Sequence, residues 1–431
     1  MADVSTRLHG IAASALAAMR EAGFEHAQAT ASALAKEEIN IAHNAPSLMR
    51  STETRRLSLL GLVGGRKAST EFADLDDASA VQGRIAALFA GAGSAPVDDA
   101  NAVSAGEQGR IVRGPLDSDT RVLADTVDEL LAYREREAPK MMLDEAFVAH
   151  NRVESCTLTS GGSALECRLG SYEISIAGVA RDGKRSSSFA SAGGTCDSLV
   201  GMPVAARFGI AEMLRDAEQQ IETRPIGARF TGSVVLAPSA VEDLVVWLLG
   251  QFDDSALIAG TSLYRQRVGQ PVASPLLSLS SRFDAPGTVA FSTDGFVARP
   301  VDVLAAGTLR TLLPTLYGSR KAGLPHTPVA AAGWQLAAGT TARAAMVGDV
   351  VHGAFVGRLS MGRPAANGDF SGVIKNSFAI ESGHLAGALS ETMITGNVAR
   401  MLEGVAAVSR ERLDTGAWLL PWLSVGGLHF S

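Results

Sequence analysis

Apolar residues recur at helical spacing in three parts of the first half of the chain. Leu8, Ala15 and Met19 fall on one face of an N-terminal helix, and similar spacing covers residues 76–90 and 120–136. An apolar stripe of this kind is typical of a helix that packs on one side. We therefore predict three amphipathic helices, the second and third of them covering one face of a sheet.

Short runs of β-forming residues, bounded by glycine, predict the strands of that sheet. Residues 56–63 and 66–72 flank Gly64-Gly65 and are expected to form a hairpin. Between residues 146 and 195 the pattern indicates an antiparallel meander of short strands. These strands are expected at residues 153–158, 164–169, 173–180 and 186–190. A further helix is predicted over residues 203–220.

The second half repeats the mixture of helices and strands. A strand at residues 232–236 runs into a helix that opens at Pro238, and a hairpin surrounds Ala306-Gly307. Strand-like, glycine-punctuated segments fill residues 344–430. The chain is therefore predicted to be α+β, with two domains that each carry a mainly antiparallel sheet and flanking helices. We expect these domains to cover residues 1–222 and 223–431.

Composition narrows the classes of partner. The 431 residues carry a net charge of −7, and we find no basic stripe interleaved with aromatic residues, so a nucleic acid partner is not expected. No apolar run is long enough to cross a membrane, and charged residues interrupt the N-terminus where a signal peptide would need an apolar core. The three cysteines lack metal-ligand or disulfide spacing. These features predict a cytoplasmic protein.

Four ordered blocks in the second half resemble the TldD/PmbA family. They are GSVVLAPSA at residues 232–240, FSTDGFV at 291–297 with LAAGTL at 304–309, LYGSRKAGL at 316–324, and NGDFSGVIKNSFAIESG at 367–383 with ETMITGN at 391–397. The hairpin of the first half and the segment APVD at residues 95–98 add weaker support. The resemblance thus spans nearly the whole chain, and it implies a zinc peptidase built from two related subunits.

One kind of subunit in this family carries the motif HExxxH on the helix that follows the strand, and a cysteine near its C-terminus completes the zinc site. Two histidines one turn apart present both imidazoles to one ion, and the glutamate activates water. Here the corresponding helix, residues 241–250, reads VEDLVVWLLG without a histidine, and Gly416 and Ala417 stand about where the cysteine would fall. The chain therefore resembles the TldE/PmbA type of subunit, which lacks the metal site.

The resemblance implies a partner subunit and a different role for each subunit. We expect a heterodimer with an HExxxH-bearing TldD-type subunit, with zinc in that partner and no metal or other cofactor in this chain. This chain would contribute a chamber that holds unfolded or small peptides, with strand edges pairing to the peptide backbone. Peptide degradation or maturation is the implied role.

Candidate site residues come mainly from the fourth block. Glycine-flanked turns leave the backbone approachable, so Asn367, Gly368, Asp369, Phe370 and Ser371 are candidates for peptide binding. The alternative is a structural turn in which Asp369 bonds its own backbone.

His326, in a proline-flanked loop, is the other candidate, and a surface histidine is the alternative at that position. No residue is predicted to be catalytic, because neither a metal-ligand pattern nor a GxSxG elbow is present.

Two other functions remain open at this point. A self-sufficient homodimer could perform a tailoring hydrolysis in peptide or small-molecule biosynthesis, but it would need a water-activating pair that the sequence does not reveal. A peptide-binding scaffold is the third alternative.

Overall fold

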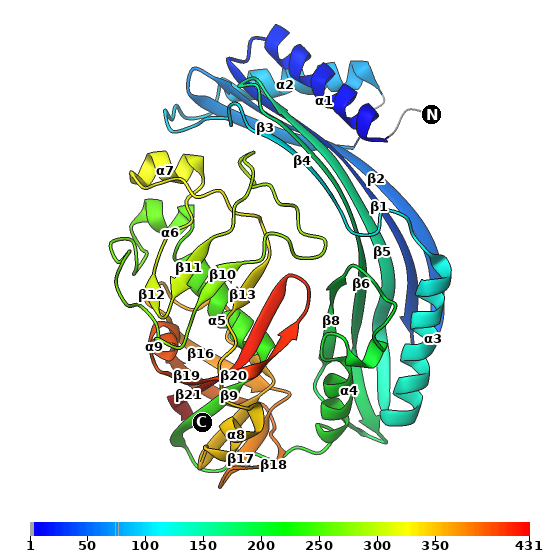
Figure 1. Cartoon of the computed structure of the whole chain (residues 1–431), viewed down its shortest axis with the longest axis vertical. Coiled ribbons are helices and arrows are strands. Elements are labelled where there is room, and N and C mark those ends of the chain that lie inside the picture. The colour runs from blue at the N-terminus through cyan, green and yellow to red at the C-terminus, as the bar shows by residue number, and fades with distance from the viewer. Residues whose placement is uncertain (1–3, 74, 76) are drawn as a thin grey trace.

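The computed structural model describes residues 4–73, 75 and 77–431. Two large sheets dominate it, each with helices packed against it, so the predicted α+β class is confirmed (Figure 1). Most neighbouring strands are antiparallel; the parallel pairs between named strands are β4–β6 in the first sheet and β9–β14 and β13–β21 in the second.

The first sheet has the strand order β3-β2-β1-β5-β6-β4, with β7 and β8 also paired to β6. Its strands are β1 (His26–Ala42), β2 (Ala45–Val63), β3 (Arg66–Phe72), β4 (Gln108–Arg113), β5 (Met141–Thr159), β6 (Ala164–Asp182), β7 (Arg185–Ser186) and β8 (Ala190–Cys196). The predicted hairpin is confirmed as β2 and β3. The N-terminal part of β2 and all of β1 had no counterpart in the prediction.

The prediction of a meander of short strands is wrong in the lengths of the strands. Residues 153–158 lie inside β5, and the two runs at 164–169 and 173–180 form the single strand β6, which pairs with β5 over nearly its whole length. Gly170 does not end a strand. A Cβ atom at this position would lie 1.5 Å from the carbonyl oxygen of Pro115, so the glycine admits a crossing segment at close range.

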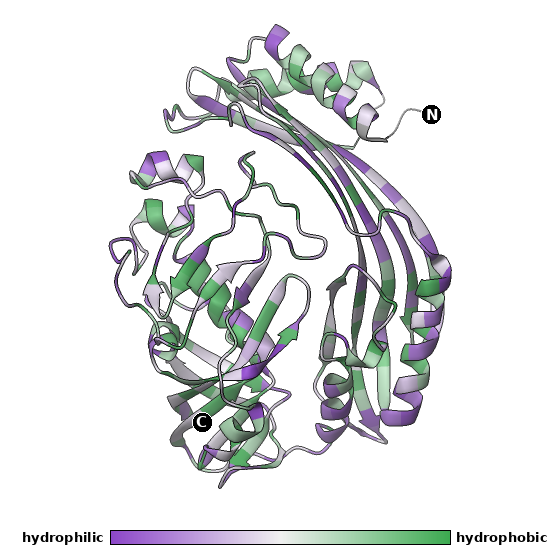
Figure 2. Ribbon diagram, in the orientation of Figure 1, coloured by the Kyte–Doolittle hydropathy of each residue, from purple (hydrophilic) through white to green (hydrophobic). Residues whose placement is uncertain are grey.

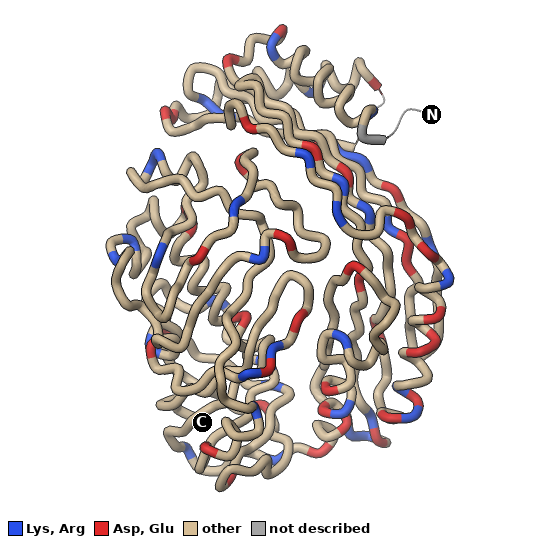
Figure 3. The backbone as a smooth tube through the Cα atoms, viewed as in Figure 1, with Lys and Arg blue, Asp and Glu red and all other residues tan. Residues whose placement is uncertain are grey.

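The long strands alternate between hydrophobic and hydrophilic residues (Figure 2), as expected for a sheet whose two faces have different neighbours. Acidic and basic residues are interspersed along them (Figure 3), and several pair between neighbouring strands, as Arg56 does with Glu71. Charge pairs across strands favour one register of the ladder.

Helices cover the outer face of the first sheet (Figure 1). They are α1 (Val4–Glu21), α2 (Ala78–Ala92) and α3 (Thr120–Glu137). Leu8, Ala15 and Met19 of α1 are buried, as predicted, and Asp119 caps α3 through the amides of its first turn. The helix predicted over residues 76–90 is confirmed as α2, although residue 76 lies outside the described residues.

The helix predicted over residues 203–220 is interrupted. A 3-10 turn, η1 (Val204–Ala206), precedes α4 (Ile210–Gln219). Between them Phe208 and Gly209 have φ angles of 53° and 75°, a left-handed conformation that no helix continues through. Burial of the Phe208 side chain offsets the cost of this conformation.

The second sheet belongs to the C-terminal half and has the order β12-β11-β10-β13-β21-β9-β14-β17-β18, with β15, β16, β19 and β20 off this path. Its strands are β9 (Phe230–Leu236), β10 (Leu279–Ser281), β11 (Asp302–Ala305), β12 (Thr308–Leu309), β13 (Trp334–Leu336), β14 (His352–Val356), β15 (Arg358–Ser360), β16 (Asp369–Lys375), β17 (Phe378–Glu381), β18 (His384–Ala388), β19 (Thr392–Asn397), β20 (Val405–Asp414) and β21 (Trp418–Phe430). The predicted strand before Pro238 and the hairpin at Ala306-Gly307 are both present.

Five helices are described in the second half: α5 (Pro238–Gly250), α6 (Asp254–Ala259), α7 (Leu316–Ala322), α8 (Arg343–Gly348) and α9 (Val398–Glu403). Of these, α5, α8 and α9 pack on this sheet, and α6 and α7 pack against each other. Val241, Leu244 and Leu248 of α5 are buried in the core of this half, which is why the helix carries so few polar residues. No helix within the described residues combines the length and the apolar character needed to cross a bilayer.

We expect Gly170→Ala to destabilise the chain by about 3 kcal/mol or more, because the added methyl group cannot share space with the Pro115 carbonyl. Thermal and denaturant unfolding would measure the loss. Gly83→Ala is the matched control: this exposed glycine inside α2 has no atom within 4 Å of the added Cβ, and alanine should stabilise the helix by about 0.5–1 kcal/mol. Wild-type stability of the Gly170→Ala variant would contradict the close approach.

Candidate interdomain cavity

A cavity of about 420 Å³ lies where the first sheet meets the second half of the chain. From the first part it is lined by Ser175, Ala190, Ser191, Ala192, Gly193, Phe208, Gly209, Glu212, Met213, Asp216 and Ala217. From the second part it is lined by Ala237, Pro238, Ser239, Glu242, Phe355, Gly357, Arg358, Asn376, Leu413, Thr415, Trp418, Leu420 and Trp422. Apolar rings and aliphatic groups thus surround a small set of charged side chains.

Three carboxyl groups face this cavity from two helices. Glu212 and Asp216 are one turn apart on α4, a spacing that places both on one helix face. Glu242 lies in the second turn of α5, opposite the side that packs into the core. Its sequence neighbour Asp243 is not part of the cavity lining but lines an adjoining depression beside Arg358, which Glu242 also lines.

Burial changes the acidity of these groups. Burial raises the pKa of Glu242 to about 7, and the nearby charge of Asp243 adds to the effect. Burial also raises the pKa of Asp216 to about 7, aided by Glu212 and opposed by Arg215 and Arg343. Groups with such pKa values can hold or release a proton near neutral pH, which is the requirement for general acid–base chemistry.

The edge of β8 supplies backbone groups to the cavity. The Thr195 N–H donates to the Thr415 carbonyl, 3.0 Å away, so it points away from β6. Backbone direction alternates along an antiparallel strand, and the N–H and C=O groups of Gly193 and Ser191 therefore also point away from β6. Both residues line the cavity, where an extended peptide could pair with them.

The cavity does not fit a zinc site. Its lining contains neither histidine nor cysteine, the ligands that zinc prefers. Gly416, near which the resemblance places the family cysteine, has a φ angle of 86°, and a Cβ atom there would lie 2.4 Å from the Thr195 carbonyl oxygen. Backbone packing therefore leaves no room for a side chain at this position.

The block predicted from Asn367 to Ser371 lies away from the cavity lining and forms a tight turn. Asn397 donates to the Asp369 carboxylate and to the Asn367 carbonyl, both at 2.8 Å, and these amide contacts hold the pKa of Asp369 below its usual value. Gly368 has a φ angle of 89° and packs close to the Trp247 ring.

The last two residues of that block differ in exposure. Phe370 is buried in the core of the second half, and Ser371 is exposed on β16. The contacts of Asn367, Gly368, Asp369 and Phe370 are of the structural kind, and a role for the five residues in peptide binding stays a prediction.

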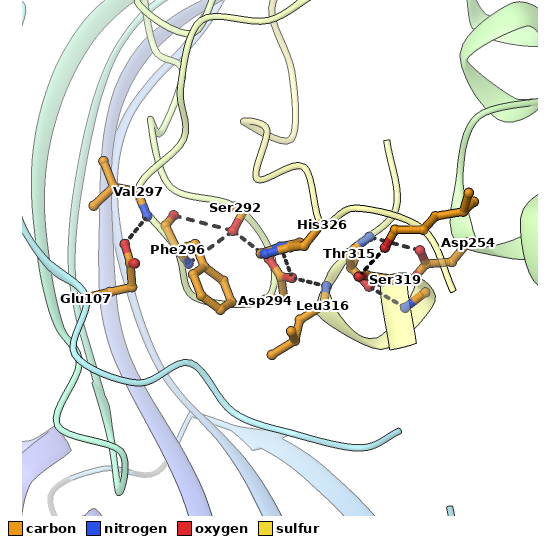
Figure 4. A network of polar contacts seen from close by, with 12 residues as sticks. Glu107, Asp254, Ser292, Asp294, Phe296, Val297, Thr315, Leu316, Ser319 and His326 are labelled. Carbon is orange, nitrogen blue, oxygen red and sulfur yellow. Dashed lines mark hydrogen bonds and ion pairs between the residues drawn. The ribbon is translucent and has the colours of Figure 1, made fainter. Parts of the chain in front are cut away.

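His326 is also placed in a polar network rather than in the cavity (Figure 4). Its Nε2 lies 3.0 Å from Oδ2 of Asp294, and its ring meets the Phe296 ring edge-on. The same carboxylate oxygen accepts from the Leu316 N–H at the start of α7, while Ser292 donates to its other oxygen. The histidine thus fastens one loop to the turn that contains Asp294.

That turn docks against the first sheet. The Glu107 carboxylate accepts from the Val297 N–H (Figure 4). The Phe291 side chain is buried in one apolar cluster with Leu165 and Leu169 of β6. Asp98 makes a second connection between the two halves: its carboxylate accepts from the Tyr317 hydroxyl and pairs with Lys321. The two halves are therefore joined through blocks that carried the family resemblance.

The carboxyl groups of the cavity were not predicted as site residues. Glu242 is a polar position on an otherwise apolar helix, and Asp216 lies in a helix that ordinary amphipathic spacing explains. No sequence pattern predicts that Asp216 and Glu242 line one cavity, because this depends on how α4 and α5 are placed in the fold. The one available signal was a carboxylate within an otherwise apolar helix.

We expect Glu242→Gln to change stability in a pH-dependent way. The folded chain holds the carboxyl proton up to about pH 7, whereas the unfolded chain releases it near 4.5, so this group makes the folded state lose stability as the pH rises between these values. Glutamine removes the effect, and the variant should gain about 2 kcal/mol relative to the parent between pH 5 and pH 8.5.

Unfolding curves at both pH values would measure this gain. Ser239→Ala is the control on the same helix, since it removes a polar group without a titratable proton. An equal difference between Glu242→Gln and the parent at both pH values would contradict burial of the carboxyl group.

Comparison with known proteins connects this arrangement to a family. Residues 230–431 match the model of the PmbA/TldA metallopeptidase C-terminal domain. A metalloprotease PmbA homologue from Haemophilus influenzae is 26% identical over 207 residues, a match that spans 43% of this chain and 45% of that protein.

Solved structures agree over the whole chain. TldE from Thermococcus kodakarensis superposes with a TM-score of 0.81 at 17% identity, covering 97% of this chain and 99% of that one. A protein from Bacteroides thetaiotaomicron, described as a candidate modulator of DNA gyrase, gives 0.85 at 18% identity and 98% coverage of both chains. These identities establish a common fold. The match over residues 230–431 supports membership of the TldD/PmbA family.

Proposed function

We propose that this chain is the subunit of a two-part zinc peptidase that lacks the metal site and contributes a peptide-binding chamber. The observation that carries the proposal is the cavity beside α5 and the β20–β21 turn, where zinc ligands would be expected and none of the lining residues is a histidine or cysteine. An HExxxH-bearing TldD-type subunit would supply the zinc and complete the heterodimer.

The cavity favours an extended peptide as the ligand. Two outward-facing residues of β8 offer backbone donors and acceptors, and the acidic groups outnumber the basic Arg358 in the lining. A peptide with a basic terminus or side chain would therefore find both strand pairing and opposite charge. Unfolded or small peptides fit a cavity of this size, which supports a role in peptide degradation or maturation.

The free thiols of Cys156, Cys167 and Cys196 suit a reducing compartment, and we propose that the protein acts in the cytoplasm.

A second candidate function has one observation in its favour. Asp216 and Glu242 form the pair of groups with near-neutral pKa values that a self-sufficient hydrolase would need to activate water. In that case a homodimer could act without zinc.

We expect Ser191→Pro to weaken binding of an extended basic peptide by about fivefold, because proline removes one outward N–H and its hydrogen bond. The N–H at this position faces away from β6, so the sheet keeps its ladder and the melting temperature should change little. Fluorescence anisotropy with a labelled hexapeptide would measure the affinity. Ser191→Ala keeps the N–H and is the matched control; equal binding by both variants would count against pairing at β8.

We expect peptide hydrolysis only when this chain is mixed with an HExxxH-bearing relative from the same organism, and we expect a chelator to abolish it. Native mass spectrometry of the mixture should give a heterodimer. Replacement of the partner's first motif histidine is the control, because it removes zinc chemistry without touching this chain.

Two results would overturn this proposal. Chelator-resistant hydrolysis by the isolated chain, lost on Asp216→Asn or Glu242→Gln, would instead establish the second candidate. Peptide binding by the mixture without any hydrolysis would leave a peptide-binding scaffold.

A further inference from the structure

A histidine, a cysteine and a glutamate meet between α1 and the first sheet, although no sequence motif links them. Cys156 of β5 and Glu166 of β6 are direct cross-strand partners and so project from the same face of the sheet. His9 of α1 lies over them. One ligand atom from each of the three side chains lies within 4.8 Å of the other two.

The two distances from His9 Nδ1 are close to edges of a coordination tetrahedron. The distance from His9 Nδ1 to Cys156 Sγ is 3.7 Å, and that from His9 Nδ1 to Glu166 Oε1 is 3.2 Å. Zinc–ligand bonds of ordinary length at tetrahedral angles place nitrogen and sulfur about 3.6 Å apart, and nitrogen and oxygen about 3.4 Å apart. Only small movements would bring the three atoms to one ion.

The surroundings allow an ion to enter and be held. The His9 side chain is 49% exposed, whereas Cys156 is 2% exposed, so the cluster opens toward solvent on the helix side. The second carboxylate oxygen of Glu166 lies 3.8 Å from Arg110 Nε, which orients the carboxylate as outer partners of metal ligands commonly do.

We propose that His9, Cys156 and Glu166 form a binding site for a divalent ion of the zinc class, with a water molecule as the fourth ligand. The mixture of nitrogen, sulfur and oxygen donors suits zinc rather than calcium or magnesium, which prefer oxygen ligands alone. This site is separate from the zinc that the proposed function assigns to the partner. Its effect would be to pin α1 to β5 and β6.

Binding requires loss of the thiol proton. A cysteine thiol carries its proton at neutral pH, and only the thiolate binds a metal ion. The ion forms a bond to sulfur as the S–H bond breaks, and the proton passes to the buffer. No electron is transferred in this exchange.

The test is titration of the full chain, first dialysed against a chelator, with zinc in a calorimeter and with cobalt in a spectrophotometer. We expect one ion per chain, a thiolate-to-cobalt charge-transfer band, and release of about one proton per ion, as thiolate ligation requires. His9→Ala and Cys156→Ser should each weaken binding by more than about 100-fold, since removal of a ligand costs more than removal of an outer partner.

Two matched controls separate the site from nonspecific binding. Cys167 is equally buried but lies on the opposite face of β6, in contact with Phe291, so Cys167→Ser should bind zinc like the parent. His43 is exposed and pairs with Asp144 alone, so His43→Ala should also leave binding unchanged.

The exposed position of His9 makes His9→Ala the variant that tests the site even if Cys156→Ser unfolds. Absence of zinc binding by the parent, or full binding by the His9→Ala variant, would overturn the proposal and leave a His9–Glu166 hydrogen bond only. Peptide binding should be unaffected by His9→Ala whatever the outcome, so failure here is distinguishable from failure of the proposed function.

Discussion

One backbone hydrogen bond, from the Thr195 N–H to the Thr415 carbonyl, joins the edge of β8 to the β20–β21 turn. The position of β8 beside the cavity depends on this contact. It fixes which residues of β8 face the cavity, because backbone direction alternates along the strand. The same contact brings the Thr195 carbonyl so close to Gly416 that no side chain fits there. The same approach therefore keeps the β8 edge beside the cavity and excludes a side chain at position 416.

The carboxyl groups of the cavity follow from the same junction. Asp216 and Glu242 come from helices on either side of it, and the apolar wall formed by Phe208, Trp418 and Trp422 limits their hydration. Each group is therefore close to half ionised at neutral pH. A positively charged ligand would favour the ionised carboxylates and lower both pKa values.

Much of the fold followed from local patterns. Apolar spacing and helix signals placed α1, α2, α3 and α5, and the turns at Gly64-Gly65 and Ala306-Gly307 placed two hairpins. The strand β1 was missed because its buried face carries Ala27, Ala29, Ala31 and Ala33, and alanine is neither large nor a strong strand former.

Gly170 misled for a related reason. Glycine is required here because the Pro115 backbone, which is far away in sequence, passes close to it. No local pattern distinguishes such a glycine from one in a turn.

The site was harder to predict than the fold, and the structure shows why. The blocks that carried the resemblance hold the two halves of the chain together. Asp294 accepts from the Leu316 N–H at the start of α7 and contacts His326, and its loop packs on β6. Such residues hold the geometry of the junction whichever side chains line the cavity.

The residues that decide the chemistry are instead scattered. The pKa values of Asp216 and Glu242 are raised by burial, which arises only when the two halves of the chain pack together. None of the contacts made by Asp98, Glu107 and Asp294 uses a side chain of the cavity lining. The lining can therefore change while the junction between the two halves is kept.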